Sequence, residues 1–228
     1  MKKWFVGAGV LVVILAGWGW SRHDRAANEH ALAAVASELA GRHVGVECQG
    51  FWSEFVDIND RAGDVPFPAG RAPDHTYLTR KVCRALKRFR TASSHTELDC
   101  LLAVDWSRWS PETDFQGPCP AHAWTAAEAI NTLTHESMHL RGFVNEAQTQ
   151  CYAIQLDAWT VIRLGGTPAQ GAAVARFVLA VQPALATEYQ SSDCRSGGSL
   201  DLHPETPAFP AEAVPSLPPA SLRGPALG

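Results

Sequence analysis

The longest apolar stretch of the chain lies at its start, where residues Trp4–Trp20 carry no charge and no strongly polar side chain. Lys2 and Lys3 precede this stretch, and charged residues follow it from Arg22 onward. As a helix it would span about 25 Å, which is the short end of what crosses a bilayer. Tryptophans stand at both of its ends, where indole rings favour the membrane interface. We therefore expect residues 1–25 to be a single-pass anchor with a cytoplasmic N-terminus. A cleaved signal peptide is the alternative, and both export the remainder.

The next part of the chain predicts one helix, then short strands and a loop. Residues 25–40 are mostly good helix formers, and Gly41 is suited to end the helix. Residues 43–48 alternate between apolar and polar positions, and residues 51–58 form a second strand-like run. Residues 59–73 contain Asn, Asp, Gly and Pro, a composition that is typical of a loop.

The second half of the chain shows helical spacing of its apolar residues. A helix is expected from Asp74 or Thr76 to about Arg90, whereas residues 97–109 fit either a strand or a helix. Three further helices are expected over residues 125–141, 145–164 and 167–183. Each opens on a capping residue with Glu or Gln three positions later: Thr125 with Glu128, Asn145 with Gln148, and Thr167 with Gln170. Gly142 and the pair Gly165 and Gly166 mark the ends of the first two.

The expected architecture is α+β and mainly helical, with one extracytoplasmic domain over residues 26–202 behind the N-terminal segment 1–25. The last part of the chain, residues 203–228, contains seven prolines and shows no helical period. Such a composition predicts a disordered tail.

Charge and composition narrow the class of protein. The formal net charge is −4, which argues against a surface built to bind nucleic acid. The basic residues are 15 Arg and 4 Lys in a chain rich in Ala, Gly and Pro. We interpret this bias as the codon usage of a GC-rich bacterial genome rather than as a functional signal.

Six cysteines agree with export to an oxidising compartment. They are Cys48, Cys83, Cys100, Cys119, Cys151 and Cys194. No two of them form a C-x-x-C pair, which disfavours a thiolate zinc site or a thioredoxin-like motif. An even number behind an export signal predicts up to three disulfides, and the spacing leaves fifteen connectivities open.

The strongest chemical signal is the run His135-Glu136-Ser137-Met138-His139, an H-E-x-x-H motif inside a predicted helix. Residues four apart on a helix share one face, so both imidazoles can donate a nitrogen to one zinc ion. Glu136 lies about 100° around the helix from His135. It is therefore placed beside the metal as a general base rather than as a ligand.

A catalytic zinc site needs a third protein ligand and one open position. Glu146 is the best candidate, because it opens the next helix and the turn at Gly142 can fold that helix back over the first. Asp157 lies about 16 Å further along the same helix, which is too far to join the same metal. Cys151 points about 140° away from Glu146 and suits a disulfide.

This stretch resembles the zincin metallopeptidases, which the H-E-x-x-H motif defines. A Glu ligand on the following helix is similar to the gluzincins. The run from Glu146-Ala147 to Cys151-Tyr152-Ala153 resembles the corresponding helix of compact gluzincin-like peptidases. Metzincins differ, because Asn145 stands where they place their third ligand and no methionine follows Met138. The resemblance covers about residues 123–165.

The resemblance implies a zinc-dependent peptidase of a bacterial, membrane-anchored branch that cleaves peptides or proteins outside the cytoplasmic membrane. His135, His139 and Glu146 would hold Zn²⁺, and Glu136 would be catalytic. The donor that stabilises the oxyanion stays open among three residues, namely His122, Tyr152 and Tyr189. The alternative is a non-catalytic cell-surface domain that disulfides, with or without zinc, hold together.

Overall fold

The structure is a computed structural model that describes residues 23–50, 63–64, 72–109, 117–210, 216–218, 220–222 and 224. The expected anchor up to residue 22 and the expected strand over 51–58 lie outside these residues. Among the described residues, no helix has the length and apolar character needed to span a membrane.

The expected helix in the first part of the domain is present over residues 23–40, and Gly41 ends it in the left-handed conformation with φ 69°. A small sheet follows, with strand order β1-β3-β2. Strand β1 (Gly45–Cys48) runs parallel to β3 (His75–Leu78), and β2 (Gly63–Asp64) runs antiparallel to β3 at the edge. The prediction of a strand within residues 43–48 is therefore confirmed.

Two expectations in this region are wrong. The predicted loop over residues 59–73 contains β2, which is too short to show an alternating pattern. The helix expected from Asp74 or Thr76 begins later, as α2 (Arg80–Thr91), because His75–Leu78 alternates between partly and fully buried positions as a strand. The Thr79 side chain caps α2 by accepting a hydrogen bond from the amide of Val82.

The ambiguous stretch after α2 is helical, with a 3₁₀ turn η2 (Thr96–Leu98) that continues into the short helix α3 (Asp99–Leu102). The next helix, α4 (Ala121–Leu140), starts four residues before the predicted capping box. Thr125 does not cap it, because its hydroxyl donates to the carbonyl of Ala121 one turn earlier. The N-cap position of α4 is occupied by Pro120, whose side chain makes no capping hydrogen bond.

The boundaries of the last two long helices follow the prediction. Helix α5 (Glu146–Arg163) opens on Asn145, whose side chain accepts from the amide of Gln148. Helix α6 (Pro168–Val181) opens on a complete capping box between Thr167 and Gln170. The short turns η3 (Gln182–Ala184) and η4 (Thr187–Tyr189) follow it.

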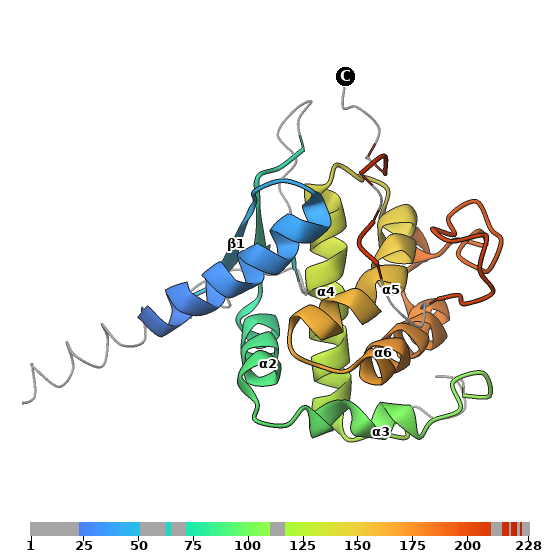
Figure 1. The fold of residues 1–228 in the computed structure, drawn as a ribbon, viewed down its shortest axis with the longest axis horizontal. Coiled ribbons are helices and arrows are strands. Elements are labelled where there is room, and N and C mark those ends of the chain that lie inside the picture. Colours follow the sequence, from blue (N-terminus) through green and yellow to red (C-terminus); the bar gives the residue numbers. More distant parts are fainter. Residues whose placement is uncertain are drawn as a thin grey trace, which may run out of the picture.

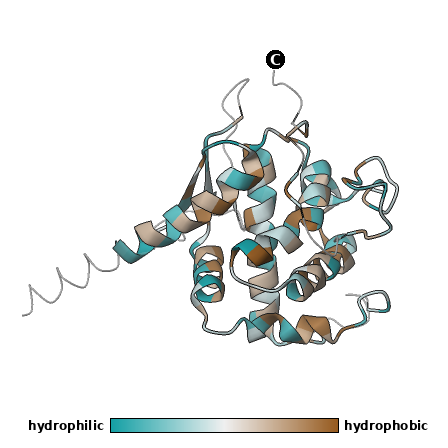
Figure 2. Ribbon diagram, viewed as in Figure 1, coloured by the Kyte–Doolittle hydropathy of each residue, from teal (hydrophilic) through white to brown (hydrophobic). Residues whose placement is uncertain are grey.

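Helix α4 is the central element of the fold. It stands between β1 and α2 on one side and α5 and α6 on the other (Figure 1). Helix α2 carries hydrophilic and hydrophobic residues side by side, as expected of a helix with one buried face (Figure 2). The structure is mainly helical with a small sheet, which agrees with the α+β expectation. The C-terminal half of α4 is buried over eight consecutive residues, Leu133–Leu140, so polar side chains there need partners inside the protein.

Three disulfides each join one cysteine to the next cysteine along the chain. They are Cys48–Cys83, Cys100–Cys119 and Cys151–Cys194. The first links β1 to α2, the second links α3 to the segment before α4, and the third links α5 to the segment after η4. The prediction of up to three disulfides is confirmed, and so is the expectation that Cys151 forms one of them.

The described part of the Pro-rich segment contains neither helix nor strand. Even so, Phe209 and Leu222 pack against the hydrophobic core, and the carbonyl of Leu222 accepts a hydrogen bond from Arg141. These contacts join two positions of the segment to the folded core, and the disorder expected from composition stays a prediction. Apolar side chains in the segment supply contacts that its proline content does not reveal.

Replacement of Cys151 and Cys194 by Ser should lower the free energy of unfolding by about 2–4 kcal/mol, because the open loop gains entropy when the chain unfolds. Urea unfolding of both proteins measures this difference, and peptide mapping without reduction should recover the three pairs. Six reactive thiols in the unreduced protein would contradict both the pairing and an oxidising location.

Candidate metal centre

The candidate centre starts from two histidines on one face of α4. His135 and His139 are four residues apart and are 7% and 5% exposed. Their rings meet edge to face, with centroids 4.7 Å apart. The Nε2 atoms of the two rings are 3.0 Å apart, so both nitrogens point into the same small space.

The turn after α4 brings a carboxylate to the same space. Gly142 takes a φ of 104°, which side chains other than glycine rarely adopt, and its amide donates to the carbonyl of His139. The chain then reverses, and the Asn145 cap starts α5 at Glu146. As a result, Glu146 lies over the histidines although seven positions separate it from His139.

Three ligand atoms converge as a nearly equilateral triangle. Glu146 Oε2 lies 3.0 Å from His135 Nε2 and 3.2 Å from His139 Nε2. A tetrahedral ion with bonds of about 2.0–2.1 Å keeps its ligand atoms roughly 3.3 Å apart. Two imidazole nitrogens and one carboxylate oxygen at this spacing fit a metal ion, and these three residues form the group of possible metal ligands among the described residues.

The remaining nitrogen of each ring has its own partner. His135 Nδ1 lies 2.9 Å from Gln150 Oε1, and His139 Nδ1 lies 2.7 Å from the carbonyl oxygen of Phe143. Both partners are acceptors, so each Nδ1 carries the proton and donates it. Each Nε2 can therefore give a lone pair to a metal ion, as ligation requires, or carry the proton of a hydrogen bond to Glu146 before an ion binds.

Burial and charge act in opposite directions on the three groups before a cation binds. Burial raises the pKa of Glu146, but hydrogen bonds with His135 and His139 outweigh burial and hold this pKa far below its ordinary value. Burial lowers the pKa of His139, but the hydrogen bond with Glu146 and the charge of Glu136 outweigh it, so this pKa is raised above 6.5. The centre therefore has a negative electrostatic potential, which attracts a metal cation or, in its absence, a proton.

Glu136 follows His135 on α4 and is 6% exposed. The edge strand β2 covers it closely: a Cβ added to Gly63 would lie 2.5 Å from Glu136 Oε1. Only glycine allows the backbone to approach so closely. The structure therefore holds a buried carboxylate beside the three ligands without making it one of them.

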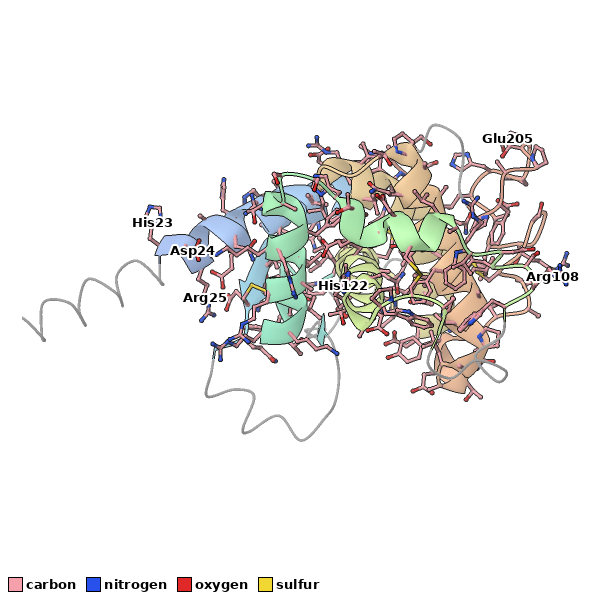
Figure 3. The ribbon with its side chains drawn as sticks, turned by 90° about the horizontal axis from the view of Figure 1, so that it is seen from below. His23, Asp24, Arg25, Arg108, His122 and Glu205 are labelled. Atoms are coloured by element: carbon pink, nitrogen blue, oxygen red, sulfur yellow. A yellow bond between two sulfur atoms is a disulfide. The ribbon has the colours of Figure 1, made fainter. Side chains whose placement is uncertain are left out.

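The three residues considered as oxyanion donors lie in different places. The ring of Tyr189 lies 5.8 Å from that of His135 and is partly exposed. Tyr152 packs on Phe143, and its hydroxyl accepts a hydrogen bond from Gln148. His122 is a helical residue at the N-terminal end of α4 (Figure 3), about 20 Å from the centre along the helix axis, so its expected loop position and donor role are wrong.

The structure shows two residues that support the candidate centre and that sequence reasoning missed. Gln150 holds His135, and it could have been found, because it lies one turn after Glu146 on the same face of α5. Gly63 covers Glu136, and no local signal identifies it, since the contact joins a two-residue strand to a distant helix.

Comparison of the chain with protein-family models, with curated proteins and with solved structures found no match. The interpretation of the centre therefore depends on its own geometry.

The variant His139→Ala should lose a bound divalent ion, because one of the three ligand atoms is removed. Zinc titration by calorimetry, together with melting curves at about 100-fold excess over Kd, should show the loss of roughly 2.7 kcal/mol of metal stabilisation. His122→Ala is the matched control on the same helix and should bind like the wild type. Equal binding by His139→Ala would exclude this ligand set.

Metal affinity should fall as the pH falls, and the decline should start above pH 6.5 because the raised pKa of His139 lets protons compete early. Glu146 stays ionised in this range, since its pKa is far below its ordinary value. Competition of the protein with a chelating dye for zinc, from about pH 5.5 to 8.5, measures the profile. An affinity that is constant across this range would contradict histidine ligation.

Proposed function

We propose that the protein is a zinc-dependent hydrolase that cleaves peptide bonds outside the cytoplasmic membrane. The observation that carries this proposal is the convergence of two imidazole nitrogens and one carboxylate oxygen beside a second, non-ligating carboxylate. The next paragraphs argue the metal, the reaction and the location in turn.

Zinc is the metal that this donor set favours. Two histidines and one glutamate are a usual ligand set of catalytic zinc, and a site with three protein ligands keeps one position open. The histidine side chains are 9% and 6% exposed, whereas that of Glu146 is 36% exposed. The centre is thus open to solvent on the side of Glu146, which suits entry of a substrate.

In the proposed reaction, bound zinc would polarise the substrate carbonyl and lower the pKa of water. Glu136 accepts the proton of the attacking water and then passes it to the leaving amine as the carbon–nitrogen bond breaks. His135 and His139 would each offer Nε2 to the metal, because Gln150 and the carbonyl of Phe143 accept their Nδ1 protons. Tyr189, whose ring lies 5.8 Å from that of His135, is the donor that we propose for the substrate oxygen.

Location outside the cytoplasmic membrane is supported by two features. Three disulfides form readily in an oxidising compartment and are rare in the bacterial cytosol. The apolar segment Trp4–Trp20 has the composition of a single-pass anchor or a signal peptide. We therefore propose a membrane-bound domain whose substrates are peptides or proteins on the outer side.

The variant Glu136→Gln separates an enzyme from a structural zinc domain. It should retain zinc, because Glu136 is not a ligand, but should lose about 10²–10⁴-fold of turnover, since the general base is gone. Turnover of a quenched peptide library, with zinc content and melting temperature measured in parallel, tests this. Glu128→Gln on the same helix is the control and should keep full turnover.

A non-catalytic surface domain predicts the opposite result. No library peptide would then be cleaved by the zinc-loaded wild type, or Glu136→Gln would equal it. Either outcome would remove the hydrolase proposal while leaving the metal centre in place.

A further inference from the structure

The interface between α4 and α5 contains a row of buried polar side chains behind the metal centre. Asp157 of α5 is fully buried, as are Thr134 of α4 and Thr160 of α5. Burial of polar groups costs free energy unless each group finds a partner. Apolar residues would fill this interface at lower cost, so the row calls for a role beyond packing.

From Asp157, a continuous series of side-chain hydrogen bonds leads to a proposed metal ligand. Asp157 Oδ2 lies 3.0 Å from Asn131 Nδ2, and Asn131 Oδ1 lies 3.1 Å from Gln150 Nε2. Gln150 Oε1 then lies 2.9 Å from His135 Nδ1. We call this series, from Asp157 through Asn131 and Gln150 to His135, the buried relay.

We propose that Asp157 is a positioning residue, which acts through the buried relay to keep the proton of His135 on Nδ1 and the lone pair of Nε2 directed at the metal. The proposal deepens the metal centre of the proposed function and does not depend on peptidase activity. It concerns a residue too distant, at about 16 Å along α5 from Glu146, to touch the ion.

The direction of every bond in the relay follows from its two ends. At one end, His135 Nδ1 lies against Gln150 Oε1 while Nε2 points into the centre, so Nδ1 is the nitrogen that donates when Nε2 holds a metal ion. Each amide then accepts through its oxygen and donates through its nitrogen. At the other end, Asp157 supplies the acceptor oxygen that terminates the series.

Without this terminal acceptor, the side-chain amides of Asn131 and Gln150 can flip and exchange the positions of their oxygen and nitrogen atoms. A reversed Asn131 presents its oxygen to the place of residue 157, and Gln150 can then present its nitrogen to His135. An amide N–H that points at Nδ1 stabilises the tautomer with the proton on Nε2, and that tautomer cannot ligate a metal through Nε2. Asp157 thus controls the ligand through two intermediates.

The acceptor oxygen of Asp157, rather than its charge, carries this role. Burial raises the pKa of Asp157 well above its ordinary value, although hydrogen bonds with Asn131 and Thr134 oppose the shift. A neutral carboxyl group still offers a carbonyl oxygen to Asn131. Asparagine has the same shape and also offers such an oxygen, so Asp157→Asn is the conservative rescue and Asp157→Leu removes the acceptor.

The test measures the tautomer of His135 in the metal-free full chain carrying Glu146→Ala, where no carboxylate competes for the Nε2 proton, and the zinc affinity of each relay variant with Glu146 intact. Long-range ¹⁵N–¹H correlation spectra at about pH 9, where histidines are neutral, report the nitrogen that carries the proton. A His135→Ala spectrum identifies the signals of His135 among nine histidines.

The wild type and Asp157→Asn should show His135 with its proton on Nδ1 and should bind zinc alike. Asp157→Leu should show proton on Nε2 and bind zinc about 10–100-fold more weakly. Asn131→Leu breaks the relay at a half-buried position and should give the same result. If Asp157→Leu does not fold, Asn131→Leu serves as the test variant.

Gln155→Leu is the matched control, because Gln155 is a buried amide of α5 whose hydrogen bonds run to Cys151, Leu200 and Leu202 and not to the relay. It should keep the wild-type tautomer and affinity. The proposal is overturned if the two relay variants keep the Nδ1 tautomer, if Asp157→Asn is impaired like Asp157→Leu, or if Gln155→Leu shifts the tautomer equally. A wild type that does not bind zinc would reject the metal centre, while the tautomer would still decide on the relay.

Discussion

The reversal of the chain between α4 and α5 is the constraint on which the centre depends. A left-handed glycine at residue 142 ends one helix, and the Asn145 cap starts the next. Two histidines and Glu146 meet because α5 packs along the buried half of α4. One carboxylate oxygen and two imidazole nitrogens lie within 3.2 Å of one another. Such close contact of polar groups is stable when a cation or a proton compensates the negative charge.

The rest of the structure supports this meeting point. Strand β2 covers Glu136 through Gly63, so the carboxylate beside the ligands is largely removed from solvent. The Cys151–Cys194 disulfide fixes α5 one turn and a half after Glu146, on the side that faces away from the ligands. Polar side chains continue from His135 into the interface of the two helices and end at Asp157. The fold thus positions the ligands from several directions.

Sequence reasoning succeeded where the information is local. Helical spacing and caps such as Asn145 and Thr167 are encoded within four residues, and so is the shared face of His135 and His139. It failed where distant segments decide. His75–Leu78 forms a strand because β1 pairs with it, and Thr125 bonds its own helix because α4 had already begun at Ala121. The disulfide pairing and the contact of Gly63 with Glu136 are likewise long-range and leave no local pattern.

The central claim is that one zinc ion binds to His135, His139 and Glu146. X-ray absorption spectroscopy at the zinc edge of the zinc-loaded full chain tests it most directly. We expect four nitrogen or oxygen neighbours at about 2.0–2.1 Å, together with the outer-shell scattering of two imidazole rings. A sulfur neighbour at about 2.3 Å, or the absence of imidazole scattering, would show that the ion binds elsewhere and would contradict the claim.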